Sequence, residues 1–334
     1  MAAARVAVHG AGSVGCFVGG CWQAAGVPVT FVGRERFARD IAQHGLTVSD
    51  YRSWQRRLET VDYRTDPSAL GEAEIIALCV KSGATGQAAA EIAEHGGDGA
   101  LVISFQNGIR NFDVLEKTLG NRFALARGLV SYNVAYLGDG RFHKGVAGSL
   151  HAEALPRTRR LAEAVGATPA DLKLSTDMLE LAWGKLLINL NNAVNALSGR
   201  TLLEELRQRD YRRVVAASQR EGLALLEAAG IAPAQLGAAR PKMLPRLIDS
   251  PDWLFRNVFL RKWKIDERAR SSMADDLAAG HRTEVDYLNG ELVALAERLG
   301  RDAPVNRRIV ELVRAAEAGA KPMAPAELRR AALG

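Results

Sequence analysis

The sequence predicts two domains, an N-terminal α/β domain built on a doubly wound parallel sheet and a C-terminal domain made only of helices. In the first half, short apolar runs alternate with helical stretches, which is the pattern of parallel strands joined by crossover helices. From about residue 177, long amphipathic segments follow one another with few strand signals. A chain of 334 residues suits two domains better than one small one. We therefore expect the domains to be residues 1–176 and 177–334.

A glycine-rich turn follows the first apolar run. It reads Gly10-Ala11-Gly12-Ser13-Val14-Gly15, and a second apolar run, Val27–Gly33, begins one helix length later. In such a βαβ unit the first glycine permits the tight turn, the second lets a pyrophosphate approach the backbone, and the third lets the helix pack closely on the sheet. The unpaired N–H groups at the start of the helix, around Ser13 and Val14, form an anion site. The turn predicts a dinucleotide site; the alternative is a structural glycine turn.

The residues after the second strand indicate which dinucleotide binds. A site for NAD normally ends this strand with Asp or Glu, which binds the ribose hydroxyls. This chain has Arg34 there, followed by Glu35 and Arg36. A guanidinium can form paired hydrogen bonds with a 2′-phosphate, so we expect NADPH/NADP+ as cofactor, with Arg36 in support. Two alternatives are a solvated charge cluster and a ribose contact by Glu35.

Composition excludes several classes of protein. Lys and Arg exceed Asp and Glu by six, but the basic residues are spread out and often neighbour acids, so we expect no nucleic-acid partner. The three cysteines, Cys16, Cys21 and Cys79, have no metal-site spacing and no disulfide framework, and we expect them to be core residues in a reducing cytoplasm. No apolar run approaches the length of a membrane span and no signal peptide is visible, so we expect no membrane association.

The remaining elements are predicted from their periodicity. In the first half we expect a small strand pair at 45–48 and 60–63, buried strands at 75–80 and 100–105, a helix at 87–95, and strands extending the sheet within 124–150. In the second half we expect helices at 178–197, 202–229, 273–299 and 306–318, with a loop over the site at 234–252.

Two strand ends carry polar residues. Lys81 follows the strand at 75–80 and Asn107 follows the strand at 100–105. The carboxyl ends of parallel strands meet at one edge of the sheet, where ligands bind. Both residues are therefore candidates for the cofactor cleft. The alternatives are a solvated lysine, which is the commoner case at a strand end, and an ordinary turn asparagine.

After the glycine turn, the strongest indication of a functional site is a polar stripe on a largely apolar helix. Lys185, Asn189 and Asn192 fall at i, i+4 and i+7, on one face. Their predicted core neighbours are Leu186, Leu187, Ile188, Leu190 and Val194. Polar groups on such a helix are unfavourable unless something satisfies them, which favours a polar ligand in an interdomain cleft. The alternative is a buried polar network that fixes packing.

A third signal lies within residues 271–290. Ser271 and Asp275 suit a capped helix start with an acidic first turn. Thr283 and Glu284 have no such explanation in the middle of the predicted helix. His9 and His281 are expected to be packing or surface residues without a catalytic role.

These motifs together resemble those of the ketopantoate reductase (2-dehydropantoate 2-reductase) family. The order matches over nearly the whole chain: the glycine turn, Arg after the second strand, VKS, QNG, WxKLxxN and SSMxxDxxxGxxTExDxLNG. The resemblance implies a Rossmann domain joined to an all-helical domain resembling that of 6-phosphogluconate dehydrogenase. It also implies reduction of 2-dehydropantoate to (R)-pantoate with NADPH, a step toward coenzyme A. The partner would be a small anionic 2-oxo acid.

The resemblance also implies roles for individual residues. Lys185 corresponds to the general acid, and Asn107, Asn189 and Ser272 to substrate contacts. Lys81, Asn107 and Glu284 lie near the cofactor in the family pattern. Since Ser272 and Glu284 are twelve residues apart, a straight helix would separate them by roughly 18 Å, so one small substrate contacts both only if the helix bends near Gly280.

The chain departs from the family pattern at two positions, one of which is a further asparagine beyond the lysine helix that has no match within residues 200–204. Some members place an amide eight residues after the lysine, where this chain has Ala193, and Asn192 is the nearest substitute. The sequence therefore leaves two alternatives to 2-dehydropantoate as substrate, another 2-oxo acid or a bulkier ketone. A bulkier ketone would need a larger apolar pocket, which could be built by the aromatic residues Trp253, Phe255, Phe259 and Trp263. Core packing or a dimer contact would equally explain that aromatic cluster. A non-catalytic NADPH-binding sensor is a further alternative, and we expect that a homodimer can form through the helical domain.

Overall fold

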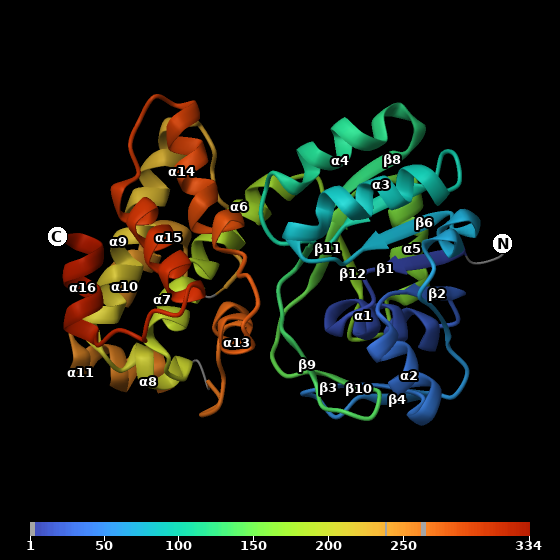
Figure 1. The fold of residues 1–334 in the computed structure, drawn as a ribbon, viewed down its shortest axis with the longest axis horizontal. Helices are drawn as coiled ribbons and strands as arrows, with labels where there is room; N and C mark the ends of the chain where they lie inside the picture. Colours follow the sequence, from blue (N-terminus) through green and yellow to red (C-terminus); the bar gives the residue numbers. More distant parts are fainter. Residues whose placement is uncertain (1–3, 238, 262–264) are drawn as a thin grey trace. The chain divides into compact units, whose positions relative to one another are not determined.

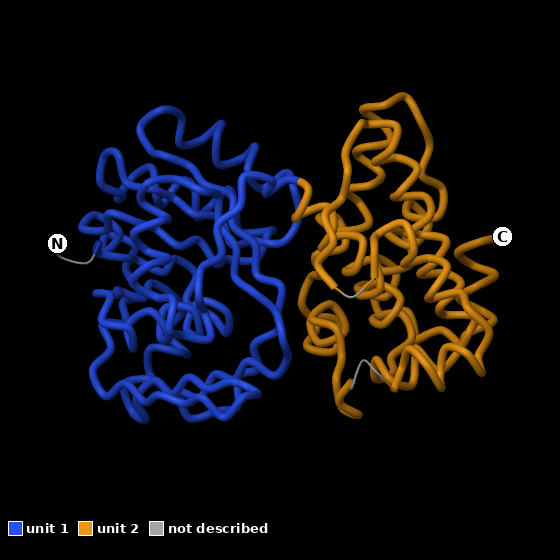
Figure 2. Tube along the Cα trace, turned by 180° about the vertical axis from the view of Figure 1, so that it is seen from behind, with its two compact units in different colours: residues 1–179 blue, residues 180–334 orange. Residues whose placement is uncertain are grey.

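The computed structural model describes residues 4–237, 239–261 and 265–334. The chain divides into two compact units, residues 1–179 and residues 180–334 (Figure 2). The first unit is α/β and the second contains only helices among its described residues. The predicted fold class is thus confirmed.

An eight-stranded sheet forms the centre of the first unit (Figure 1). All neighbouring strands are parallel except the pair β8 and β11. From one edge to the other the strands are β12 (Leu172–Ser175), β11 (Leu150–Glu153), β8 (Ala124–Val130), β7 (Leu101–Ser104), β6 (Ile75–Leu78), β1 (Val6–His9), β2 (Val29–Val32) and β5 (Asp62–Arg64).

Both faces of this sheet are covered by helices, because alternate side chains of each strand point to opposite faces. On β1, Val6 and Val8 join the core beneath α1, whereas Ala7 joins the core beneath α3 and α4. The helices of this unit are α1 (Ser13–Ala24), α2 (Glu35–His44), α3 (Thr85–His95), α4 (Asn111–Leu119) and α5 (Pro156–Val165). The short turns η1 (Pro67–Glu72), η2 (Ser82–Ala84) and η3 (Gly120–Arg122) connect them.

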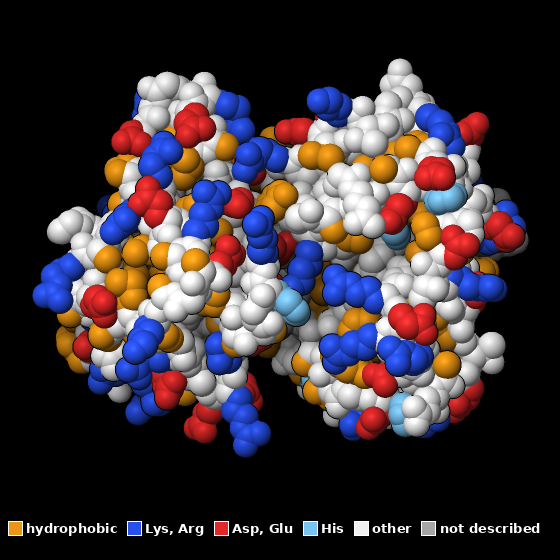
Figure 3. Space-filling model, viewed as in Figure 1, with side chains coloured by type: hydrophobic (Ala, Val, Ile, Leu, Met, Phe, Trp, Pro, Cys, Tyr) orange, Lys and Arg blue, Asp and Glu red, His pale blue; other side chains and the backbone are white. Residues whose placement is uncertain are grey.

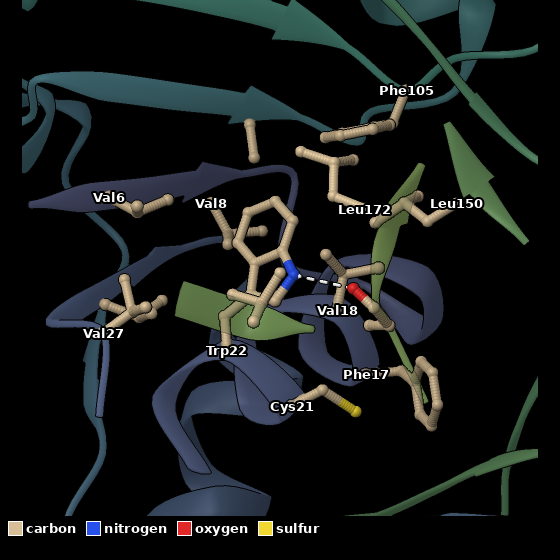
Figure 4. Packing of buried hydrophobic residues seen from close by; sticks show 14 of the residues in the cluster. Val6, Val8, Phe17, Val18, Cys21, Trp22, Val27, Phe105, Leu150 and Leu172 are labelled. Atoms are coloured by element: carbon tan, nitrogen blue, oxygen red, sulfur yellow. Dashed lines mark hydrogen bonds between the residues drawn. The ribbon is translucent and has the colours of Figure 1, made fainter. Parts of the chain in front are cut away.

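Helix α1, which begins at the glycine turn, is fastened to the sheet by Trp22. The indole is fully buried among residues of β1, β11 and β12, including Val8, Leu150 and Leu172 (Figure 4). Its Nε1 donates a hydrogen bond to the carbonyl oxygen of Ala170 at 3.0 Å. A large buried ring with its one polar atom satisfied holds the helix rigidly.

A second, four-stranded sheet packs against α1 and corrects two predictions. Its order is β4 (Gln55–Leu58), β3 (Leu46–Asp50), β10 (Arg141–Lys144) and β9 (Val134–Tyr136). The predicted pairing of 45–48 with 60–63 is wrong, since β3 pairs with β4 and with β10, while β5 pairs with β2 in the main sheet. Within 124–150, only β8 and the start of β11 extend the main sheet, and β9 and β10 belong to the small one.

The second unit is organised around α9, a helix of 20 residues that contacts most of the other helices. The described helices from α6 onward are α6 (Met178–Asn189), α7 (Asn191–Ser198), α8 (Leu202–Leu206), α9 (Arg209–Ala228), α10 (Leu244–Ile248), α11 (Asp252–Leu254), α13 (Ser272–Ala278), α14 (Asn289–Arg298), α15 (Pro304–Glu317) and α16 (Pro325–Leu333). Short turns of 3-10 or π geometry are η4 (Pro241–Met243), η5 (Phe255–Leu260) and η6 (Val285–Tyr287).

Several predicted helices are interrupted. The helix predicted at 178–197 is divided at Leu190, and that at 202–229 is divided into α8 and α9. The helix predicted at 273–299 is wrong in its middle: α13 ends at Ala278 and the chain turns at Gly280, whose φ is +68°. The loop predicted at 234–252 contains η4 and α10, whose Pro245 and Ile248 are buried.

The surface mixes both signs of charge. On the face drawn in Figure 3, Lys and Arg side chains are interspersed with Asp and Glu over both units. Among the described residues, no helix combines the length and apolar character that crossing a membrane requires.

Candidate functional site

The three glycines of the turn differ in what a side chain would meet. At Gly10 the backbone has φ +88°, and a Cβ would lie 2.5 Å from the amide nitrogen of Val80. At Gly15 a Cβ would lie 2.8 Å from the carbonyl oxygen of Gly10 and 2.9 Å from Cγ1 of Val8. At Gly12 the nearest atom is 4.0 Å away. Folding therefore explains the first and third glycines, while the second leaves space for a ligand.

The start of α1 offers unpaired donors beside that space. Gly12 is the N-cap residue, and no described side chain caps the helix or places a carboxylate in its first turn, where Ser13 and Val14 stand. The first N–H groups of a helix and its dipole attract anions. The residues present therefore fit a pyrophosphate.

Arg34 stands where β2 gives way to α2. Its side chain is exposed and has no hydrogen-bond or ion-pair partner in the described part of the chain. Its neighbours are engaged: Glu35 pairs with Arg39 at 3.7 Å, and the guanidinium of Arg36 lies 5.5 Å from the ring centroid of Phe37. Among the three, Arg34 is the residue best placed to take a further anion.

Lys81 and Asn107 stand at the same sheet edge as the glycine turn. Strands β1, β6 and β7 are parallel neighbours, and His9, Leu78 and Ser104 are in register at their carboxyl ends. Lys81 is exposed and Asn107 is partly buried. The edge therefore brings the glycine turn and both strand-end residues together within one unit.

A buried hydrogen-bond network fixes these strand ends. Nε2 of Gln106 donates to the hydroxyl of Thr85 at 2.7 Å, and Nδ2 of Asn111 donates to the hydroxyl of Ser82 at 3.0 Å. That hydroxyl donates to the carbonyl oxygen of Asn107 at 3.0 Å. Satisfied polar networks in low dielectric are rigid. These supporting residues were not identified from the sequence, although the polar residues that directly follow β6 and β7 mark the same edge of the sheet.

In the helical unit, the predicted stripe is partly exposed on its polar side. Lys185 and Asn189 on α6, and Asn192 on α7, are each half-buried. Of the five predicted core neighbours, Leu186, Leu187, Leu190 and Val194 are buried. Ile188 is 43% exposed, so that prediction is wrong.

The environment of Lys185 makes it a stronger acid than a free lysine. Burial lowers the pKa of its ammonium group from 10.5 to about 8, and the carboxylate of Glu284 acts in the opposite direction. The group is still largely protonated at neutral pH. A lysine with this pKa is suited to give a proton to a developing alkoxide.

Ser271 ties the start of α13 to α7. Its hydroxyl donates to the carbonyl oxygen of Asn192 at 3.1 Å, and its N–H donates to Oδ1 of Asn195 at 2.9 Å. Nδ2 of Asn195 donates to the carboxyl group of Glu205 at 3.0 Å. Glu205 is fully buried, and burial raises its pKa to about 8. Ser272, exposed at the first position of α13, is thereby fixed relative to Asn192.

The turn at Gly280 places Glu284 outside any straight helix with Ser272. Glu284 precedes η6 and is partly buried, close enough to Lys185 to act on its pKa. His281 is exposed, whereas His9 is buried, with Nε2 2.9 Å from a carboxylate oxygen of Glu91.

The aromatic residues before α13 do not share one environment. Phe255 is fully buried, and its ring centroid lies 4.2 Å from the guanidinium carbon of Arg212. The ring centroids of Phe255 and Phe259 are 6.2 Å apart. Trp253 is 68% exposed, and Trp263 lies outside the described residues. Phe255 is therefore a core residue, which weakens the prediction of an apolar pocket.

A glycine turn of this kind on a doubly wound sheet is typical of dinucleotide-binding domains, and a lysine whose pKa is lowered to about 8 suits a general acid. The fold and these residues together indicate the class of dinucleotide-dependent oxidoreductases. The family model "Ketopantoate reductase PanE/ApbA" matches residues 6–157, and the model of the C-terminal part of the same family matches residues 177–317. The chain belongs to the ketopantoate reductase family and is an oxidoreductase of that family.

Relatives and solved structures agree over nearly the whole length. The 2-dehydropantoate 2-reductase of Archaeoglobus fulgidus is 29% identical over 94% of this chain and 98% of its own. A crystal structure of a PanE/ApbA family ketopantoate reductase from Ralstonia eutropha has a TM-score of 0.80 at 29% identity, covering 94% and 98%. D-mandelate dehydrogenase, solved with NADH and anilino(oxo)acetate, has a TM-score of 0.77 at 18% identity, covering 94% and 98%, and shows the shared fold alone.

Proposed function

We propose that this protein reduces 2-dehydropantoate to (R)-pantoate with NADPH, in the biosynthesis of pantothenate and coenzyme A. The family and the name of the Archaeoglobus relative support the substrate. The single observation that carries the chemistry is Lys185, a half-buried lysine whose pKa burial lowers to about 8. A positioned acid of this strength is what protonation of a reduced ketone requires.

The cofactor is assigned to the glycine turn. The open space at Gly12 and the uncapped start of α1 suit its pyrophosphate. Arg34 would bind the 2′-phosphate that distinguishes NADPH from NADH, and Lys81 would lie near the cofactor. When bound, the reduced nicotinamide supplies a hydride to the ketone carbon.

Lys185 acts on the oxygen of that ketone. Its ammonium group stabilises the negative charge that develops there and then donates a proton to the alkoxide. Glu284 keeps Lys185 protonated by raising its pKa. We further assign Glu284 to the nicotinamide ribose.

The remaining polar residues are assigned to the 2-oxo acid. Asn107, Asn189 and Asn192 would hold its carboxylate and distal hydroxyl, and Ser272 would make a further contact. The anchoring of Ser272 by Ser271 supports a fixed position for it. The mechanism requires these groups and Lys185 to reach the substrate while the glycine turn holds the cofactor.

The test is NADPH consumption with 2-dehydropantoate beside pyruvate, 2-oxoisovalerate and larger ketones, repeated with NADH. We expect the highest kcat/KM for 2-dehydropantoate with NADPH. A higher value for a bulkier ketone would replace the substrate but keep the mechanism. Tight NADPH binding without turnover of any ketone would instead favour a sensor and contradict the proposal.

Two further proposals concern the setting of the enzyme. We assign it to the cytoplasm, in line with its biosynthetic role and its three free cysteines. We also propose a homodimer through the long apolar helices of the helical unit, with Trp253, whose side chain is 68% exposed, as the contact to test. Sedimentation of the wild type and of Trp253→Ser tests this, since a monomeric wild type would contradict it.

A further inference from the structure

The hydroxyl group of Tyr63 reaches the glycine turn from the edge of the main sheet. Tyr63 lies on β5, and its hydroxyl donates a hydrogen bond to the carbonyl oxygen of Ala11 at 2.7 Å. Ala11 stands between the first two glycines of the turn. The tyrosine ring stacks on Phe31 of β2, with ring centroids 6.2 Å apart and the planes parallel. The neighbouring strand thus holds the ring while its hydroxyl contacts the turn.

Gly33 provides the space for this hydroxyl. A Cβ at Gly33 would collide with the hydroxyl oxygen of Tyr63 and lie 3.1 Å from the carbonyl oxygen of Ala11. The backbone at Gly33 does not have the positive φ that favours glycine. Glycine is therefore needed at this position by the tyrosine contact.

The peptide groups of Ala11 are held from two sides. Its N–H donates to the carbonyl oxygen of Val32 at 2.9 Å, and its carbonyl oxygen accepts from Tyr63 and from Sγ of Cys16 at 3.3 Å. A carbonyl oxygen carries partial negative charge and would repel a phosphate if it turned toward one. Fixing this carbonyl therefore fixes the turn in a form that presents donors, not acceptors, to an anion.

We propose that Tyr63 is a positioning residue for the dinucleotide, acting through the carbonyl group of Ala11 on the pyrophosphate-binding turn. This rests on the proposed function, because it assigns the turn to NADPH. Burial raises the pKa of the Tyr63 hydroxyl well above its usual range, so it stays a donor at any working pH. Arg34 lowers that pKa by a smaller amount.

The test is Tyr63→Phe, with dissociation constants for NADPH and NADH measured by fluorescence titration. We expect both to rise by about 3- to 10-fold, the effect of one neutral hydrogen bond, because the two cofactors share the pyrophosphate. With saturating NADPH, kcat and the KM for the 2-oxo acid should stay unchanged. The matched control is Tyr132→Phe, which removes a buried hydroxyl without a hydrogen-bond partner among the described residues and should leave both constants unchanged.

Three results would overturn the inference: unchanged dissociation constants in Tyr63→Phe, a loss of affinity for NADPH but not for NADH, or an equal loss of affinity in Tyr132→Phe. A loss for NADPH alone would mean that Tyr63 acts on the 2′-phosphate through Arg34. Failure of the proposed function would look different, since the wild type itself would then bind neither dinucleotide, or would bind NADPH and turn over no ketone.

A second variant tests the route through Ala11. Gly33→Ala keeps the Tyr63 hydroxyl but displaces it, so this variant should weaken the binding of both NADPH and NADH, as Tyr63→Phe does. In the Tyr63→Phe background the collision with the hydroxyl is gone and only the 3.1 Å contacts with Cβ and the carbonyl oxygen of Ala11 remain, so Gly33→Ala should add a smaller loss of affinity there than in the wild type. An equal further loss in both backgrounds would contradict the inference.

Discussion

The reduction should slow as the pH rises above about 8, because Lys185 then loses the proton that it is proposed to donate. Burial lowers its pKa from 10.5 to about 8. A proton donor works in its acid form, so kcat/KM is constant below the folded pKa and falls tenfold for each pH unit above it. The rate at pH 9.5 should thus be roughly 30-fold below that at pH 7, whereas a lysine with a pKa of about 10.4 would lose little.

The assay is the initial rate of NADPH oxidation at saturating NADPH and limiting 2-oxo acid. Glu284→Gln should move the alkaline limb to lower pH, because the Glu284 carboxylate raises the pKa of Lys185. Glu205 also titrates near pH 8, since burial raises its pKa to about 8, so Glu205→Gln is the control and should leave the limb in place. A rate that stays flat to pH 10, or a limb that moves only in Glu205→Gln, would refute the assignment to Lys185.

Three further variants separate folding from binding. Gly12→Ala should weaken NADPH binding at least tenfold with little change in Tm, whereas Gly15→Ala should lower Tm, because only a Cβ at Gly15 would meet protein atoms closely, at 2.8 and 2.9 Å. Titration with NADPH and calorimetry measure the two effects, and equal behaviour of both variants would contradict this explanation. Arg34→Ser should raise the KM for NADPH by about tenfold and leave that for NADH unchanged, and an equal rise for both would exclude a 2′-phosphate contact. Arg212→Met should lower the free energy of unfolding in urea by about 3–5 kcal/mol, because three carbonyl oxygens lose the fully buried guanidinium that donates to them and each unsatisfied acceptor costs about 1–3 kcal/mol; a loss below about 1 kcal/mol would contradict this.

The sequence was informative where one local rule decides the structure. Strands buried on both faces, such as β6, are continuous apolar runs, and the glycine turn has a fixed geometry. At Gly280 the sequence suggested a bend but not the end of the helix, because helical periodicity continues through residues 273–299 while a single residue with positive φ ends α13. The small sheet was missed because β3 and β10 are nearly a hundred residues apart and their pairing depends on packing over α1.

The candidate site shows the same division. The types and spacing of Lys185 and Asn189 on one helix face were visible in the sequence. The hydrogen bonds that fix the site were not, because Gln106 meets Thr85 and Asn195 meets Ser271 only after distant segments fold together. Exposure of Ile188 was missed for another reason: Ile188 follows Lys185 by three residues and therefore lies on the helix face of the polar stripe, whereas the prediction of burial followed only its apolar side chain.

The central claim is that Lys185 protonates the oxygen of the substrate ketone. Single-turnover oxidation of bound NADPH by 2-dehydropantoate in Lys185→Ala tests it most directly, with the NADPH dissociation constant measured in parallel. The account predicts a rate about 10²- to 10⁴-fold below the wild type and an unchanged dissociation constant. A rate within threefold of the wild type, with the cofactor bound, would contradict it.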